Sequence, residues 1–82
     1  MKYPRVQSVQ VVDDHILVVE FDNRQKRRYD ITHLLGKEMF SPLRNPALFK
    51  NVQVEKGGYA IYWNEDIDIS EYELWKNGTP MP

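Results

Sequence analysis

The feature that most constrains this chain is a pair of valine- and isoleucine-rich runs near its N-terminus. The runs RVQSVQVV (residues 5–12) and HILVVEF (residues 15–21) consist largely of residues that favour an extended backbone. Asp13 and Asp14 stand between the two runs, and aspartate is a frequent turn residue. The pattern predicts a β-hairpin.

The second run is apolar on both faces of the predicted strand, because Leu17 and Phe21 alternate with Ile16 and Val18. A strand that is apolar on both faces is typical of the middle of a sheet. The segment QKRRYDI (residues 25–31) follows, with the alternation of a strand that has one solvent-facing side. The first part of the chain therefore predicts a three-stranded meander.

Signals for short helices follow the meander. Residues 30–36 place capping side chains before an apolar pair and end at a glycine, which predicts one or two helical turns. Ser41-Pro42 and Asn45-Pro46 each place a capping side chain before a proline suited to the first helical position. Short helical turns are expected after both.

Residues 51–64, NVQVEKGGYAIYWN, predict a second hairpin around Gly57-Gly58. The predicted partners across its turn are Val52 and Val54 on one side and Tyr59, Ile61 and Trp63 on the other.

A C-terminal helix is expected over residues 71–76. Ser70 and Glu73 have the spacing of a capping box, in which the serine side chain accepts from the N–H three residues on and the glutamate returns to the serine N–H. Ile69 and Leu74 stand at the two positions of a hydrophobic staple. The Asn-Gly pair after residue 76 is a typical helix end.

Five oxygen-bearing side chains crowd the approach to this helix. A calcium loop would need a central glycine, which this stretch lacks, and a paired-carboxylate hydrolase would need a sugar-sized cleft, for which so short a chain has little room. Carboxylates are favoured near a helix N-terminus, so we interpret the cluster as a corner of the fold and predict no metal or cofactor. Its members are Asn64, Glu65, Asp66, Asp68 and Glu71.

Length and composition limit the number of domains and the class of protein. The 82 residues fit one domain, residues 1–82, with 41% apolar and 28% charged residues. No apolar run has the length of a membrane span, no signal-peptide pattern begins the chain, and cysteine is absent. We expect a cytoplasmic protein that does not bind a membrane. Its fold is expected to be α+β, with an antiparallel sheet of about five strands, short helices on one side of the sheet and a C-terminal helix.

Two groups of residues are candidates for binding. Three short helices cannot cover both faces of such a sheet, so part of the aromatic C-terminal third is expected to form a protein interface. The residues assigned to this interface are Tyr59, Tyr62, Trp63 and Trp75. The alternative is a nucleic-acid or regulatory site on the basic segment, Arg24, Lys26, Arg27 and Arg28.

The same basic residues also have a structural interpretation, because cations on an edge strand block aggregation and alternate between its two faces. Residues 1–50 hold nine Lys and Arg against six Asp and Glu, whereas residues 51–82 hold two against six. This asymmetry is compatible with a charged partner of either sign. His15 and His33 lack the neighbours of a catalytic motif, so no catalytic residue is assigned.

The chain resembles a known bacterial family, the domain of unknown function DUF2442, over about residues 5–76, and two stretches carry most of the resemblance. FSPLRNPALFKNVQV is similar to its F-x-x-L-x-D/N-P-x-L-F-x-x-V-x-V stretch, and GYAIYWNEDIDIS to its G-x-x-I-x-W-x-x-x-x-D-I-x segment. The resemblance implies a small α+β domain and brings no catalytic residues. Some members are encoded beside other small proteins in arrangements like toxin–antitoxin pairs, which implies a small protein partner.

We therefore expect a non-enzymatic domain that binds a protein partner or a second copy of itself. A nucleic-acid module is the second hypothesis, and an enzyme acting on a small molecule is the third.

Overall fold

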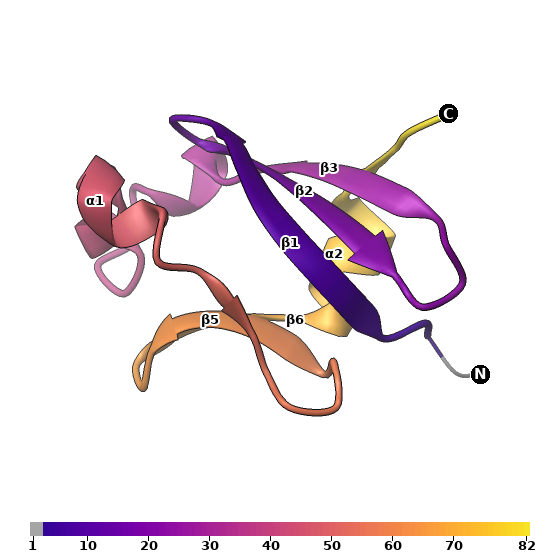
Figure 1. The fold of residues 1–82 in the computed structure, drawn as a ribbon. Coiled ribbons are helices and arrows are strands. Elements are labelled where there is room, and N and C mark those ends of the chain that lie inside the picture. The colour runs from indigo at the N-terminus through magenta and orange to yellow at the C-terminus, as the bar shows by residue number, and fades with distance from the viewer. Residues whose placement is uncertain (1–2) are drawn as a thin grey trace.

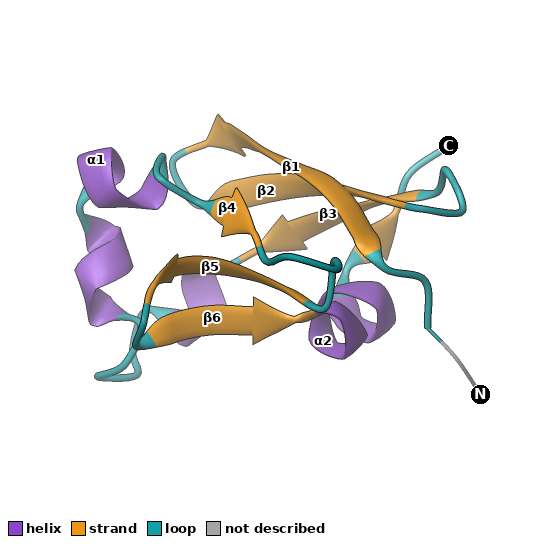
Figure 2. Cartoon of the chain, turned by 60° about the horizontal axis from the view of Figure 1, so that its bottom comes forward, coloured by secondary structure: helices purple, strands orange, loops and turns teal. Residues whose placement is uncertain are grey.

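Two antiparallel sheets face each other across the core in the computed structural model, which describes residues 3–82 (Figure 1). Their strand orders are β1-β2-β3-β7 and β4-β5-β6. The short helices η1, η2 and α1 lie towards one end of the sheets and α2 towards the other (Figure 2). The elements are β1 Val6–Asp13, β2 Ile16–Phe21, β3 Lys26–Asp30, η1 Thr32–Leu34, η2 Ser41–Arg44, α1 Pro46–Phe49, β4 Gln53–Val54, β5 Ala60–Asn64, β6 Ile67–Ser70, α2 Glu71–Asn77 and β7 Thr79–Pro80.

The predicted meander is confirmed as the first three strands. β2 lies between β1 and β3, and Val19 pairs with Val9 on one side and Arg27 on the other. Leu17, Val19 and Phe21 are completely buried. The opposite face of β2 is only half-buried, because no element of residues 3–82 packs over it (Figure 1).

The α+β class is also confirmed, but the single sheet of about five strands is wrong, since residues 3–82 contain seven strands in two sheets. The main strand that the sequence analysis did not predict is β6. Its side chains alternate between buried Ile67 and Ile69 and exposed Asp68 and Ser70, which is the period of a strand. The sequence interpretation assigned these residues to the approach of α2, and β6 runs directly into that helix.

The second predicted hairpin forms with shorter strands than expected. Val54 pairs with Ile61, as predicted, whereas Val52 lies before the start of β4. The two-residue strand β7 was also missed, because it is very short and one of its two residues is a proline.

The helix caps are partly as predicted. Asn45 caps α1 by accepting from the Ala47 N–H at 2.9 Å. Ser41 is the first residue of η2 and not its cap, and its hydroxyl donates to the Glu38 carbonyl at 3.0 Å. The first short helix, η1, ends at Leu34 with Leu35 as its C-cap, before the glycine. None of the helices in residues 3–82 has the length and apolar character needed to cross a membrane.

The two sheets are joined differently on their two sides. On one side β1 meets the β4–β5 hairpin directly, and the Val6 N–H donates to the Gly58 carbonyl at 2.9 Å. Gly58 has φ +78°, and a Cβ there would lie 2.5 Å from the Val6 oxygen, so only glycine fits. On the other side α2 contacts both β3 and β6 and partly fills the gap between the sheets.

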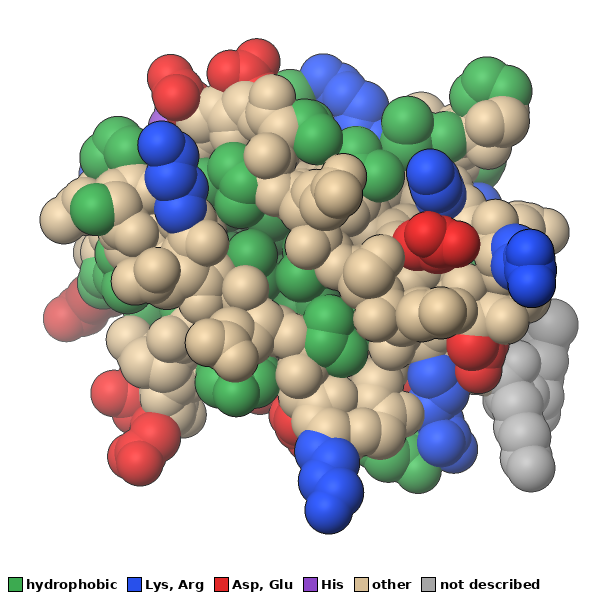
Figure 3. Space-filling view, viewed as in Figure 1, with side chains coloured by type: hydrophobic (Ala, Val, Ile, Leu, Met, Phe, Trp, Pro, Cys, Tyr) green, Lys and Arg blue, Asp and Glu red, His purple; other side chains and the backbone are tan. Residues whose placement is uncertain are grey.

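Charges of both signs lie together on the surface. Figure 3 shows Lys and Arg side chains interspersed with Asp and Glu over one face of the molecule. The asymmetry between the two halves of the sequence therefore does not produce two separate charged fields on this face.

Candidate functional site

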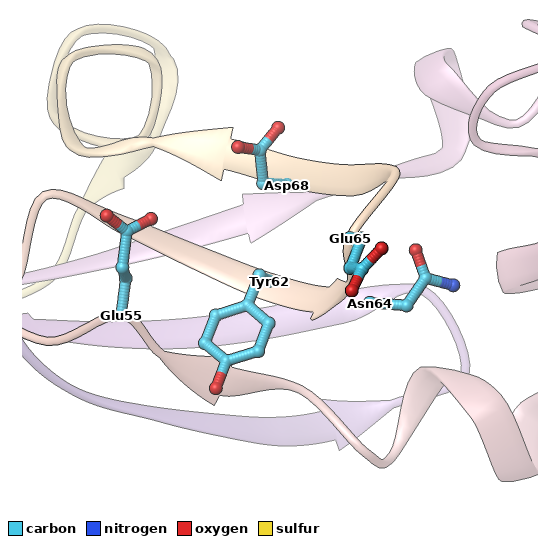
Figure 4. Close-up of a pocket in the computed structure, with 5 residues that line it drawn as sticks. All are labelled: Glu55, Tyr62, Asn64, Glu65 and Asp68. Atoms are coloured by element: carbon cyan, nitrogen blue, oxygen red, sulfur yellow. The ribbon is translucent and has the colours of Figure 1, made fainter.

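The outer face of the β4-β5-β6 sheet carries a shallow hollow with Tyr62 at its centre (Figure 4). Gln53, Tyr62 and Asp68 stand in one row across the three strands. No element of residues 3–82 covers this face (Figures 1 and 2). The space measures about 430 Å³, and we call it the Tyr62 hollow; it is lined by Glu55, Tyr62, Asn64, Glu65 and Asp68.

The oxygen-bearing stretch after β5 is divided among three structures. The Asn64 side-chain oxygen accepts from the N–H groups of Asp66 at 2.8 Å and Ile67 at 3.0 Å, and so builds the turn into β6. Asp68 projects from β6, and Glu71 is the first residue of α2. The cluster forms a corner of the fold, but Asp68 belongs to a strand and not to the helix entry that was predicted.

Residues that could hold a metal ion or act as a base are spread apart. In residues 3–82, no three His, Cys, Asp or Glu side chains are grouped in a way that could hold a metal ion. His15 is half-buried at the turn before β2, whereas His33 is exposed, with Nε2 3.4 Å from the Tyr29 hydroxyl.

Both tryptophans of the predicted interface are used inside the molecule. Trp63 is only 7% exposed, its indole N–H donates to the Phe49 carbonyl at 2.9 Å, and its ring stacks on that of Phe49. Trp75 is half-buried, with its ring edge-to-face with Phe21 at 5.1 Å and beneath the guanidinium of Arg27. The assignment of Trp63 to a surface is corrected, because its neighbours leave little of the ring accessible.

Both tyrosines of the predicted interface reach the surface. Tyr59 is 48% exposed, and the guanidinium of Arg5 lies 4.1 Å from the centre of its ring. Tyr62 is half-buried and points outward into the hollow (Figure 4), whereas its chain neighbours Ile61 and Trp63 are buried.

A second pair of exposed tyrosines was not predicted. Tyr3 and Tyr72 meet edge-to-face at 4.8 Å, and the Lys76 ammonium donates to the Tyr72 hydroxyl at 2.8 Å. This hydrogen bond is the main cause that raises the pKa of Lys76. Tyr72 and Lys76 are four residues apart on a helix, so their contact could have been inferred, whereas nothing in the sequence places Tyr3 beside them.

The basic segment does not act as one charged group. Arg27 is half-buried, its guanidinium lies 3.7 Å above the Trp75 ring, and its Nε donates to the Trp75 carbonyl at 3.2 Å. Arg24, Lys26 and Arg28 are exposed. Three of the four predicted cations therefore remain available at the surface.

The predicted capping box forms in one half only. The Ser70 hydroxyl accepts from the Glu73 N–H at 3.2 Å, as expected. The Glu73 carboxylate instead accepts from the Tyr29 hydroxyl at 2.7 Å and from the Asn77 side-chain amide at 2.9 Å. Burial, followed by the hydrogen bond and the charge of Glu73, raises the pKa of Tyr29 far above its usual range.

One family model matches the sequence over residues 6–80, nearly the whole chain, and its description is "Protein of unknown function (DUF2442)". No curated protein and no solved structure matches the chain. The resemblance of the two sequence stretches is therefore confirmed: the chain belongs to the DUF2442 family.

Proposed function

We propose that this chain is a non-enzymatic protein-interaction domain that binds a small protein partner, or a second copy of itself, through the Tyr62 hollow. The observation that carries the proposal is the position of Tyr62. Its half-buried ring lies on a sheet face that no element of residues 3–82 covers, at the centre of a hollow of about 430 Å³.

Tyrosine is enriched among the residues that dominate protein interfaces, because its ring buries a large area at a small cost in conformational entropy. The β5 backbone holds this ring between two hydrogen-bonded strands, so little ordering is needed on binding. Glu55, Glu65 and Asp68 surround the ring and favour a partner that presents Lys or Arg to the hollow.

The basic segment supports a second candidate, a nucleic-acid module, because three of its cations are exposed. Acidic residues stand among them, which weakens this candidate. Lys26 pairs across the sheet with Glu20, and Asp30 lies two residues from Arg28 on the same face of β3. A phosphate backbone approaching this face would meet both signs of charge.

Affinity purification of the tagged chain from its native cells, followed by sedimentation of the purified protein, tests the proposal. We expect a stoichiometric protein partner or a dimer with the wild type, and loss of that species with Tyr62→Ala. Tyr72→Ala is the matched control, because Tyr72 is 39% exposed and lies outside the hollow.

The nucleic-acid candidate is tested by fluorescence anisotropy with a duplex and a single strand over a range of salt. We expect binding no tighter than the non-specific range, about 10 μM at physiological salt. Tighter binding that weakens in Arg24→Ala/Arg28→Ala, with a smaller salt slope, would favour the nucleic-acid module and contradict our proposal.

A further inference from the structure

A cavity remains where α2 only partly fills the gap between β3 and β6. It measures about 240 Å³ and is open to solvent on one side. The cavity is lined by Tyr29, Leu34, Phe40, Asp68, Ile69, Ser70 and Glu73.

The cavity has apolar walls and one polar end. Leu34, Phe40 and Ile69 supply apolar surface. The polar end is formed by Asp68, Ser70 and Glu73. The Glu73 carboxylate is oriented by hydrogen bonds from Tyr29 at 2.7 Å and Asn77 at 2.9 Å. Each carboxylate oxygen has a second acceptor position, so both bonds can persist while a ligand binds.

The charges around the cavity select the sign of a ligand. Among residues 3–82, no Lys or Arg side chain lines the cavity, so an anion would meet Glu73 without a compensating positive charge from these residues. A cation would form a charge-assisted hydrogen bond with the carboxylate, and the rings of Phe40 and Tyr29 would attract it further. An ammonium group attached to a compact apolar body fits both the polar end and the walls.

We propose that this cavity is a binding site for a small primary amine in its protonated form. The ammonium group donates to Glu73, and the apolar body lies against Leu34, Phe40 and Ile69. The site is separate from the centre of the Tyr62 hollow, although Asp68 of the edge strand β6 borders both. The two proposals therefore stand independently.

Nuclear magnetic resonance titration with benzylamine, compared with the neutral isostere benzyl alcohol, tests the site. Both probes have the same shape and differ in charge. For a ligand of this size we expect a Kd on the order of 1 mM for benzylamine. We expect shifts of the Tyr29, Ile69 and Glu73 amide resonances, and at least tenfold weaker binding of the alcohol.

Glu73→Gln should weaken benzylamine binding at least tenfold and leave benzyl alcohol binding unchanged, because it removes the charge and keeps the shape. Glu55→Gln is the matched control, since it neutralises a carboxylate that lines only the Tyr62 hollow. The proposal is overturned if benzylamine does not bind, if both probes bind wild type equally, or if Glu55→Gln has the larger effect. The comparison of the two probes on wild type needs no variant to fold.

Discussion

Replacing Tyr29 by phenylalanine removes one hydroxyl group from the junction between β3 and α2. The ring is 2% exposed and would stay in place, so the change separates the hydrogen bond from the packing. A hydrogen bond to a charged group contributes about 1.5–3 kcal/mol. Because Asn77 continues to donate to the Glu73 carboxylate, we expect a loss of about 2 kcal/mol, near the low end of this range.

A loss of about 2 kcal/mol in a domain of this size lowers the Tm by roughly 8–16 °C. It is also a large share of the total free energy of unfolding of a native protein, which is roughly 5–15 kcal/mol.

The pH dependence of stability gives a second signature of the same bond. The pKa of Tyr29 is raised in the folded chain above its ordinary value of 10.0, first by burial and then by the hydrogen bond and charge of Glu73. The unfolded chain therefore loses this proton at a lower pH than the folded chain does. The contribution of protonated Tyr29 to the free energy of unfolding is therefore complete below about pH 10. It is lost as the pH rises further, by at most about 1.4 kcal/mol for each pH unit.

Urea denaturation followed by circular dichroism, at neutral pH and through the alkaline range, measures both effects. Tyr62→Phe is the control, because the Tyr62 hydroxyl makes no hydrogen bond to residues 3–82. The alkaline loss of stability should be smaller in Tyr29→Phe than in wild type or Tyr62→Phe. Equal pH profiles for all three proteins, or a loss below about 0.5 kcal/mol at neutral pH, would refute this reasoning.

Three further predictions concern the caps, the acidic stretch and the basic segment. Ser70→Ala should cost about 1 kcal/mol and add simply to Glu73→Ala, because the two side chains do not form a reciprocal box; a coupling well above 0.5 kcal/mol is the opposing result. Millimolar calcium or magnesium should leave the Tm unchanged, and a rise of several degrees that disappears in Asp68→Asn would reveal a metal site. Arg27→Ala should cost about 1 kcal/mol in unfolding measurements, since its guanidinium stacks on an indole ring, whereas Arg28→Ala should change stability by less than about 0.5 kcal/mol; equal losses would count against this distinction.

The parts of the fold that depend on neighbouring residues could be predicted from the sequence. Runs rich in valine and isoleucine predict β1 and β2, and the alternation of residues 25–31 predicts β3. The Asn45-Pro46 and Ser70 caps act within three residues of their own positions. The outward direction of Tyr62 also follows from alternation along β5. The same alternation places Trp63 with Ile61 on the buried side, so its assignment to a surface contradicted a signal that was present.

Contacts between distant parts of the chain could not be predicted. Tyr29 lies 44 residues from Glu73, and Arg27 lies 48 residues from Trp75. The sequence favours a capping box for Glu73, but its carboxylate binds Tyr29 instead. The sequence also favours a free surface cation at Arg27, but its guanidinium contacts Trp75. The division into two sheets was missed for a related reason, since the strand signal of β6 overlaps the start signal of α2.

The affinity for the captured partner, or the dimer dissociation constant if the partner is a second copy, tests the central proposal most directly. It should be measured for the wild type, for Tyr62→Ala and for Arg24→Ala/Arg28→Ala at one salt concentration. We predict at least about tenfold weaker binding for Tyr62→Ala, as for a residue at the centre of an interface, and a change below about twofold for the double arginine variant. The reverse order, with Tyr62→Ala unchanged and the arginine variant weakened, would contradict the assignment of the interface to the Tyr62 hollow.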